Sequence, residues 1–143
     1  MSAIALAVWS SSENNPFDYI LSRIVERYMD RYVEPAARPA SSSDMFRFAK
    51  PGDLLALLVS AGAAAASERV LKFSIRAPVS PEDFWTLRSE ISEKLRSKLA
   101  LLSEAQRAEL GLEAIDAFRA CSVQNGVSMP AEVLVVGGAK PAA

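Results

Sequence analysis

The chain carries few of the side chains that usually perform chemistry. It has no histidine, so the commonest general base and the commonest metal ligand are both missing. Its single cysteine, Cys121, falls on an apolar helix face and is interpreted as a small buried hydrophobe. The acids Glu82, Asp83 and Glu90 are interpreted as helix-start and surface charges. We therefore predict no catalytic residue and no metal site.

The composition favours a protein of a reducing compartment that binds neither nucleic acid nor membranes. The 16 basic and 17 acidic residues leave a net charge of −1, so there is no basic excess to neutralise phosphates. A lone cysteine cannot close an intrachain disulfide, which suits the cytosol. No apolar stretch has the length of a membrane span, and the N-terminal apolar run is too short for a signal peptide. We expect a cytoplasmic protein.

The first candidate element is a fully apolar run, Ala3-Ile4-Ala5-Leu6-Ala7-Val8-Trp9. Because no polar residue alternates with the apolar ones, the run predicts a strand buried on both faces, with a neighbour on each edge. Only Met1 and Ser2 precede it. We therefore expect a domain whose first half is encoded upstream, has been lost, or lies on another chain.

Two helices are predicted in the first half by apolar spacing and by capping signals. The first runs from Pro16 to about Tyr32, with Asn15 as its cap. The second begins at Pro51 and stops at Gly62. Its inward face is predicted to carry Leu54, Leu55, Leu57, Leu58 and Ala61.

Two further helices are predicted in the second half. Ser80 caps the first of them, whose apolar face is marked by Phe84, Leu87, Ile91, Leu95, Leu99 and Leu102. Ser103 and Gln106 form a capping box for the next helix, in which Gly111 is a candidate for a bend or a break.

Two more strands complete the predicted fold. Residues 70–76 alternate between apolar and polar, which predicts a half-exposed strand at a sheet edge, whereas residues 133–136 are apolar on both faces. The simplest α/β arrangement is a small mixed three-stranded sheet in the order first-third-second, with the third strand antiparallel and helices on its faces. We predict one domain over residues 1–143, with a flexible connection at about 34–43.

Five segments in linear order carry a family resemblance. They are the strand at 3–9, MFRFAKPGDL at 45–54, LLVSAGA at 57–63, SPEDFW at 80–85 and MPAEVLVVGGAKP at 129–141. Together they resemble the C-terminal half of a class I S-adenosylmethionine-dependent methyltransferase of the ubiquinone/menaquinone-biosynthesis-like, methyltransferase type 11 group. The resemblance implies a truncated Rossmann-like fold. In the family's seven-stranded sheet, an antiparallel last strand lies between the fifth and the sixth.

The chain departs from the family at the cofactor site. The family binds its cofactor with a glycine-rich loop after the first strand and an acidic residue at the end of the second, and neither is present here. Gly137 and Gly138 follow the last strand and do not replace that loop. The family's Ala-Gly-Phe is Ala61-Gly62-Ala63, which removes an apolar anchor. We expect no cofactor on this chain alone, and S-adenosylmethionine only where a partner supplies the missing half.

The resemblance also places candidate substrate-binding residues. Those expected to border the methyl acceptor beside the end of the first strand are Trp9, Asn14, Asn15 and Phe17. The residues themselves allow a second interpretation, an aromatic strand end and a helix cap. Trp85 lies off the leucine stripe of its helix, so it is a candidate for contact with a ligand or a partner.

Two functional hypotheses follow. In the first, the chain is a methyltransferase-related half domain that supplies acceptor-side or lid elements to a partner chain carrying the glycine-rich half. It is then a transferase component that is inactive in isolation. In the second, it is a non-catalytic, self-associating binding or structural protein derived from a methyltransferase. Both use the edge of the strand Ala3–Trp9, either for a partner chain or for a homodimer.

Overall fold

The computed structural model describes residues 2–40 and 44–142 of the chain. The chain divides into two compact units, each with buried residues of its own. Unit 1 comprises Met1–Asn15, Ser43–Phe73 and Pro130–Ala143, and unit 2 comprises Pro16–Ser42 and Ser74–Met129.

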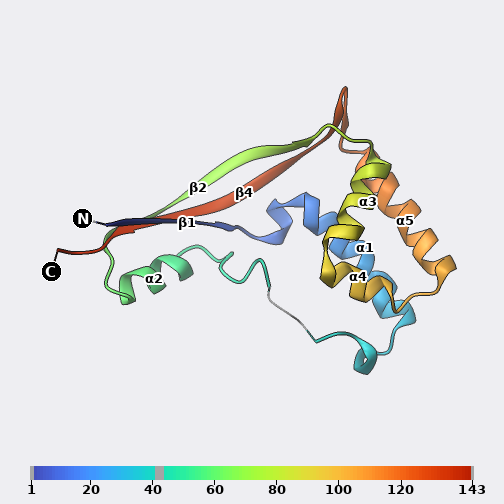
Figure 1. The fold of residues 1–143 in the computed structure, drawn as a ribbon, viewed down its shortest axis with the longest axis horizontal. Helices are drawn as coiled ribbons and strands as arrows, with labels where there is room; N and C mark the ends of the chain where they lie inside the picture. Colours follow the sequence, from blue (N-terminus) through green and yellow to red (C-terminus); the bar gives the residue numbers. More distant parts are fainter. Residues whose placement is uncertain (1, 41–43, 143) are drawn as a thin grey trace. The chain divides into compact units, whose positions relative to one another are not determined.

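The strands form one open sheet in the order β1-β4-β2. They are β1 (Ala3–Trp9), β2 (Ala64–Ala77), β3 (Ser122–Val123) and β4 (Gly126–Ala139). Figure 1 shows β2 and β4 running in opposite directions, and β1 is antiparallel to β4 with Trp9 opposite Val133. The short strand β3 pairs with the first residues of β4.

The predicted α/β class and the predicted strand order are both confirmed, with two corrections. The sheet has a fourth strand, because the turn at Asn125-Gly126 folds Ser122–Val123 back onto β4. The sheet is also antiparallel rather than mixed. The reason is that β4 lies between β1 and β2, so these two strands run parallel to each other without being neighbours.

The prediction that β1 is buried on both faces is wrong. Its three alanines are exposed, and 47% of the surface of Ile4 is exposed as well. The strand forms one edge of the sheet, and the core of unit 1 covers only one of its faces. A run of apolar residues was therefore not sufficient to place this strand in the interior.

The core of unit 1 forms where helix α2 (Asp53–Ser60) packs on the sheet. Leu54 and Leu58 lie four residues apart, on one face of the helix, and pack with Val136 of β4. Partly buried hydrophobic side chains surround this cluster: Leu6, Val8, Phe48, Leu55 and Ala63. Leu57, which was predicted to face inward, is 52% exposed because it lies on the other side of this short helix.

Two glycines with positive φ flank α2. Gly52 has a φ of +91°, and its N–H donates to both carboxylate oxygens of Glu68, at 3.2 and 3.1 Å. A carboxylate at a helix start also interacts favourably with the helix dipole. Gly62, at a φ of +89°, follows the helix and ends it as predicted.

Strand β2 forms the other edge of the sheet, which confirms its predicted position. It is longer than predicted, because the alanines at 64–66 belong to it. Glu68 contacts the start of α2, so the even-numbered side chains of β2 lie on the face that α2 covers. The odd-numbered side chains, including Leu71 and Phe73, lie on the other face. Both remain exposed, at 51% and 42%, because no described element of unit 1 covers that face.

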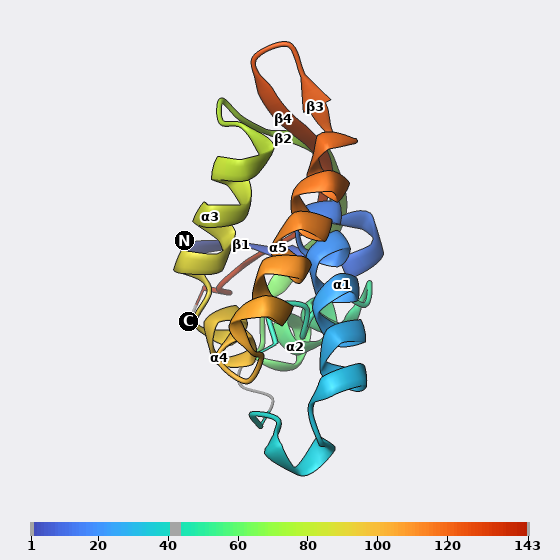
Figure 2. The same ribbon diagram turned by 90° about the vertical axis from the view of Figure 1, so that its right-hand side faces the viewer.

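Unit 2 is built from helices. They are α1 (Pro16–Tyr32), α3 (Pro81–Ile91), α4 (Glu93–Leu99) and α5 (Glu104–Arg119). Helix α5 packs against both α1 and α3, and Figure 2 shows it between them. Phe84 of α3 meets Phe118 of α5 edge to face, with ring centroids 4.9 Å apart and an interplanar angle of 87°. Such a pair contributes about 0.5–1.5 kcal/mol beyond the burial of its area.

The apolar face predicted over residues 84–102 is divided among separate segments. Ser92 ends α3 with a ψ of 108°, and its side chain accepts the N–H of Leu95, which caps α4. Leu87 and Ile91 of α3 are 44% and 68% exposed, although Phe84 of the same helix is buried. The expectation that both face the core is therefore wrong.

Helix α5 begins with the predicted capping box. The hydroxyl of Ser103 accepts the N–H of Gln106, and the side chain of Gln106 accepts the N–H of Ser103. The expected break at Gly111 does not occur, because α5 continues through it to Arg119.

The connection predicted at 34–43 is described as far as residue 40, and residues 41–43 lie outside the described residues. Its first part forms a short 3-10 helix, η2 (Pro35–Ala37). The guanidinium of Arg38 then donates to the carbonyl oxygens of Met29, at 3.0 Å, and Val33, at 3.1 Å. These bonds satisfy carbonyls at the end of α1, as a cation there should. Over the described ranges, no helix is long and apolar enough to cross a membrane.

Candidate functional site

The predicted site residues are divided between the two units. In unit 1, Trp9, Asn14 and Asn15 lie where β1 ends and the 3-10 turn η1 (Ser12–Asn14) follows. In unit 2, Phe17 lies in the first turn of α1 and Trp85 lies on α3.

Asn15 is fully buried, and both ends of its side-chain amide are hydrogen-bonded. Its Nδ2 donates to the carbonyl oxygens of Ser11 at 3.0 Å, Glu132 at 3.2 Å and Ser10 at 3.5 Å. Its Oδ1 accepts the backbone N–H of Glu132 at 2.9 Å. The side chain therefore ties the end of β1 to β4.

Asn15 also ends the hydrogen-bonded ladder between β1 and β4. The N–H of Ser10 donates to the carbonyl of Glu132 at 3.0 Å, which extends the ladder one residue past Trp9. In an antiparallel pair the reciprocal bond would join the N–H of Glu132 to the carbonyl of Ser10. The amide of Asn15 lies in that place and bonds to both groups. We refer to this arrangement of Ser10, Asn15 and Glu132 as the amide clasp.

Glu132 carries a carboxylate that the sequence analysis did not single out. Its side chain is only 17% exposed, and it accepts from Nδ2 of Asn14 at 3.2 Å. The Nζ of Lys72 lies 3.8 Å from its other oxygen. The signal in the sequence was a single acid in the last strand, directly before the apolar residues 133–136. Of the predicted polar residues, Asn14 is thus the one with an exposed position beside a carboxylate.

Ser10 lies in the same cluster and is 3% exposed. Its hydroxyl oxygen is buried and has no hydrogen-bond partner within the described part of the chain. Residues opposite each other in an antiparallel pair present their side chains to one face, so Ser10 and Glu132 share a face of the sheet.

Phe17 is part of the core of unit 2, with 7% of its surface exposed. The guanidinium of Arg88 lies 5.5 Å from the centre of its ring, within range for a cation–π contact. Arg88 also pairs with Asp18 at 3.4 Å, so the two charges are held against the ring. In unit 2 this aromatic side chain is therefore engaged in packing.

Trp85 is half-buried and lies against α5. A Cβ atom at Gly111 would fall 3.0 Å from Nε1 of the indole. The glycine therefore serves close packing of the tryptophan on a helix that would otherwise favour alanine at this position. One side of the indole is covered in this way, and the ring is not fully buried.

The edge of β1 presents backbone groups as well as apolar side chains. The N–H of Ser10 donates to Glu132 of β4, and the N–H of Lys140 donates to Ser2, so the even-numbered residues of β1 bond to β4. By the alternation of an antiparallel ladder, the amides of Ala3, Ala5 and Ala7 point away from it. Within the described residues, β4 is the only strand paired with β1, so these amides line an open edge.

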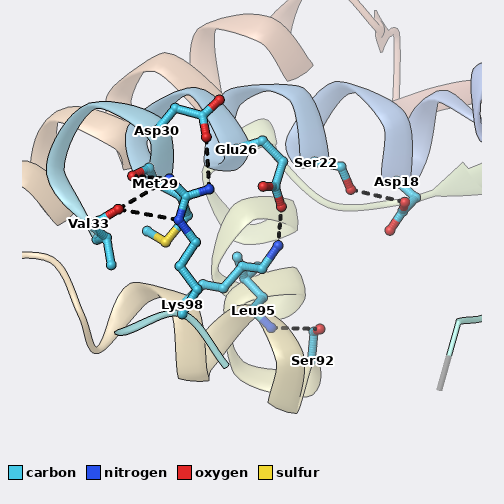
Figure 3. Close-up of polar contacts among 10 residues, drawn as sticks. Asp18, Ser22, Glu26, Met29, Asp30, Val33, Ser92, Leu95 and Lys98 are labelled. Atoms are coloured by element: carbon cyan, nitrogen blue, oxygen red, sulfur yellow. Dashed lines mark hydrogen bonds and ion pairs between the residues drawn. The ribbon is translucent and has the colours of Figure 1, made fainter. Parts of the chain in front are cut away.

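Unit 2 contains a cavity of about 490 Å³ beside the last turn of α1. It is lined in part by Glu26, Arg38, Lys94, Ser97 and Lys98. Figure 3 shows Lys98 of α4 paired with Glu26 of α1. Arg38 is already bonded to carbonyl oxygens of α1 and, at 2.8 Å, to a carboxylate of the same helix. Arg38 and Lys98 therefore neutralise groups of the chain itself.

The glycines with positive φ show whether the chain could cradle a cofactor. Gly52 and Gly62 flank α2, and Gly126 makes the turn into β4, so each of the three serves a helix end or a turn. Gly137 and Gly138 are paired with β1. Among the described residues there is no glycine-rich loop between a strand and a helix N-terminus, so these residues do not fit the family's cofactor.

The fold and its sites define a mixed α/β protein with an open antiparallel sheet, an uncharged strand edge and an amide clasp beside it. No protein-family model matches the chain, and no curated protein is significantly similar to it in sequence. Within residues 2–40 and 44–142, no three His, Cys, Asp or Glu side chains gather as metal ligands would.

Proposed function

We propose that the chain is a methyltransferase-related partial domain, Rossmann-like in origin, that supplies acceptor-side elements to a partner chain. The observation that supports the proposal is the placement of β4, which lies between β1 and β2 and antiparallel to both. This is the arrangement that the resemblance implies for the last three strands of a class I methyltransferase.

The partner would carry the glycine-rich half and would bind S-adenosylmethionine when present. Methyl transfer from a sulfonium depends on positioning the two reactants, which can lower the reaction barrier by about 7–11 kcal/mol. The reaction often needs no strong base, so the lack of histidine is compatible with it. On this chain, Trp9 and Asn14 of unit 1 would border the acceptor. Trp85, in unit 2, is a separate candidate for contact with a ligand or a partner. The contacts of Asn15 and Phe17 favour supporting roles for these two residues.

The place where the partner would dock is the open edge of β1. The outward amides of Ala3, Ala5 and Ala7 can bond to a further strand, which in the family runs parallel to this one. The lone thiol of Cys121 favours a cytoplasmic location, where thiols stay reduced.

The test is a titration with S-adenosylmethionine by calorimetry. We expect no binding to the chain alone, and micromolar affinity there would contradict the proposal. The chain is then fused behind the first four strands of a ubiquinone/menaquinone-type methyltransferase, so that the fourth strand lies next to β1. We expect the fusion to bind the cofactor more tightly than those four strands alone.

A matched pair of variants tests the docking edge. Ala5→Pro removes an outward N–H, whereas Ala5→Val keeps it, so only the proline fusion should lose the gain in affinity. A fusion that shows native circular dichroism but no gain would refute the proposal.

A second candidate is a non-catalytic, self-associating structural protein. It is favoured by the engagement of Asn15 and Phe17 in packing within their units, which leaves fewer groups for an acceptor. The fusion experiment separates the two candidates, because the second predicts that the fusion binds the cofactor no more tightly than the four strands alone.

A further inference from the structure

The two edges of the sheet differ in how they are protected. Edge strands usually carry charges or prolines that prevent pairing with another chain. Strand β2 follows this rule with four charged residues, Glu68, Arg69, Lys72 and Arg76. Strand β1 has no charged residue and no proline over its whole length. The edge of β1 is therefore open to pairing, and the occupant that matches its row of backbone groups is another strand.

We propose that the occupant is β1 of a second copy, paired antiparallel about a two-fold axis that passes through Leu6. An antiparallel self-pair needs outward amides to face outward amides, and these belong to the odd-numbered residues. Placing Leu6 opposite Leu6 of the second copy fulfils this condition, because Ala5 then faces Ala7 of that copy. The same register overlaps all seven residues of the strand.

The side chains agree with this register. On the face that α2 covers, Ile4 would lie opposite Val8 of the second copy, and the two Leu6 side chains would meet at the axis. Ile4 is 47% exposed in the single copy, so pairing would cover an exposed hydrophobic side chain. On the other face the central pairs are alanines, which bring no charge and no bulk into the interface. The product is a continuous sheet with the order β2-β4-β1-β1-β4-β2.

The inference deepens the second candidate function by naming the partner and the register, and it also bears on the first. The same edge would receive the strand of a cofactor-bearing partner, so the homodimer would cover that edge until such a partner displaced it. Dimer formation requires no cofactor. A failure here therefore leaves the cofactor titration unaffected, and the reverse also holds.

The register is tested by cysteine cross-linking in a Cys121→Ser background. Two residues at a non-hydrogen-bonded antiparallel pair have Cα atoms about 4.5 Å apart, which suits a disulfide. We expect Leu6→Cys to form a disulfide dimer on mild oxidation. Ile4→Cys alone should not, because the two copies of residue 4 would be about 13 Å apart along the strand. A mixture of Ile4→Cys and Val8→Cys chains should form mixed dimers.

Sedimentation equilibrium tests the association itself. We expect the 15.4 kDa chain to sediment with twice its mass in a concentration-dependent way. Ala5→Pro should be a monomer because it removes an outward N–H, and Ala5→Val should remain a dimer; circular dichroism confirms that both are folded. A monomeric native chain, a dimeric Ala5→Pro variant, efficient cross-linking of Ile4→Cys alone, or no mixed Ile4→Cys/Val8→Cys dimer would each overturn the proposal.

Discussion

The amide clasp predicts that Asn15 is among the most important residues for the stability of unit 1. Replacing it with alanine removes Oδ1, which accepts the N–H of Glu132, and Nδ2, which donates to the carbonyl of Ser11. The carbonyl of Glu132 keeps a partner, because the N–H of Ser10 also donates to it. The carbonyl of Ser11 keeps one as well, the N–H of Asn14 at 3.0 Å. The two backbone groups that lose a bond without such a replacement are the N–H of Glu132, at 2.9 Å, and the carbonyl of Ser10, at 3.5 Å.

The expected loss of stability follows from these two groups. A buried polar group without a partner costs about 1–3 kcal/mol. The bond to the N–H of Glu132 is only partly buried, so water can reach that group to some extent, and the bond to the carbonyl of Ser10 is buried but long. We therefore expect Asn15→Ala to lower the free energy of unfolding by about 2–4 kcal/mol.

The measurement is denaturation by urea, followed by circular dichroism. Asn14→Ala is the matched control, because the amide of this exposed neighbour makes one bond, at 3.2 Å, to a carboxylate oxygen of Glu132. We expect this control to lose about 1 kcal/mol or less. Asn15→Asp is a third variant, which keeps an acceptor for the N–H of Glu132 but places a carboxylate against the carbonyl of Ser11. The Asn15→Asp variant should be more stable at low pH than at neutral pH, because the protonated carboxyl can donate to the carbonyl of Ser11.

The reasoning would be refuted if Asn15→Ala and Asn14→Ala lost the same small amount of stability. In that case the buried amide would not be a structural tie. The interpretation of Asn15 as an acceptor-binding residue would then regain support.

Three further predictions concern unit 2. Gly126→Ala should lower the free energy of unfolding by at least about 2 kcal/mol, because φ is +141° and the new Cβ would lie 2.0 Å from the carbonyl oxygen of Ala77; near-native stability by urea denaturation would contradict this. Gly111→Ala should shift the fluorescence of Trp85 with little change in stability, since the indole must move but the helix gains about 1 kcal/mol of propensity; unchanged emission would count against the contact. Burial, reinforced by nearby carboxylates, raises the pKa of Tyr28. The folded chain therefore keeps the Tyr28 proton to a higher pH than the unfolded chain, whose tyrosine pKa is about 10. The stabilisation by the neutral phenol is complete below that pH and is lost as the pH rises through the raised pKa. Tyr28→Phe should abolish the latest step of a spectrophotometric titration, and its persistence would contradict the assignment.

The sheet order could be predicted because it depends on the character of whole strands. The last strand is apolar throughout and is central, and the alternating strand with its basic residues is an edge. The burial of β1 could not be predicted, because it depends on what covers the strand rather than on its own residues. The strand length of β2 was missed since alanines at 64–66 favour helices, and pairing with β4 overrides that preference.

Local polar chemistry was predicted where it acts between close neighbours in the sequence. The capping box of Ser103 and Gln106 is an example, since its bonds span three residues. The bonds of Asn15 to Glu132 span 117 residues, and no pattern around Asn15 indicates them. An Asn before a proline suggests a helix cap equally well, which is why the clasp was not foreseen. Ser92 was missed because the leucine spacing continues across the break.

The division into two units has a consequence for how the chain can be cut and made. The chain passes from one unit to the other four times, after Asn15, Ser42, Phe73 and Met129. No single proteolytic cut releases either unit intact, and deletion of the last fourteen residues would remove the central strand of unit 1. During synthesis, β1 emerges before the other described helices and strands, and its partner β4 emerges after them. Residues 3–139 must therefore all leave the ribosome before unit 1 can fold. We expect unit 1 to fold slowly for its size, because its central contacts join residues far apart in the sequence.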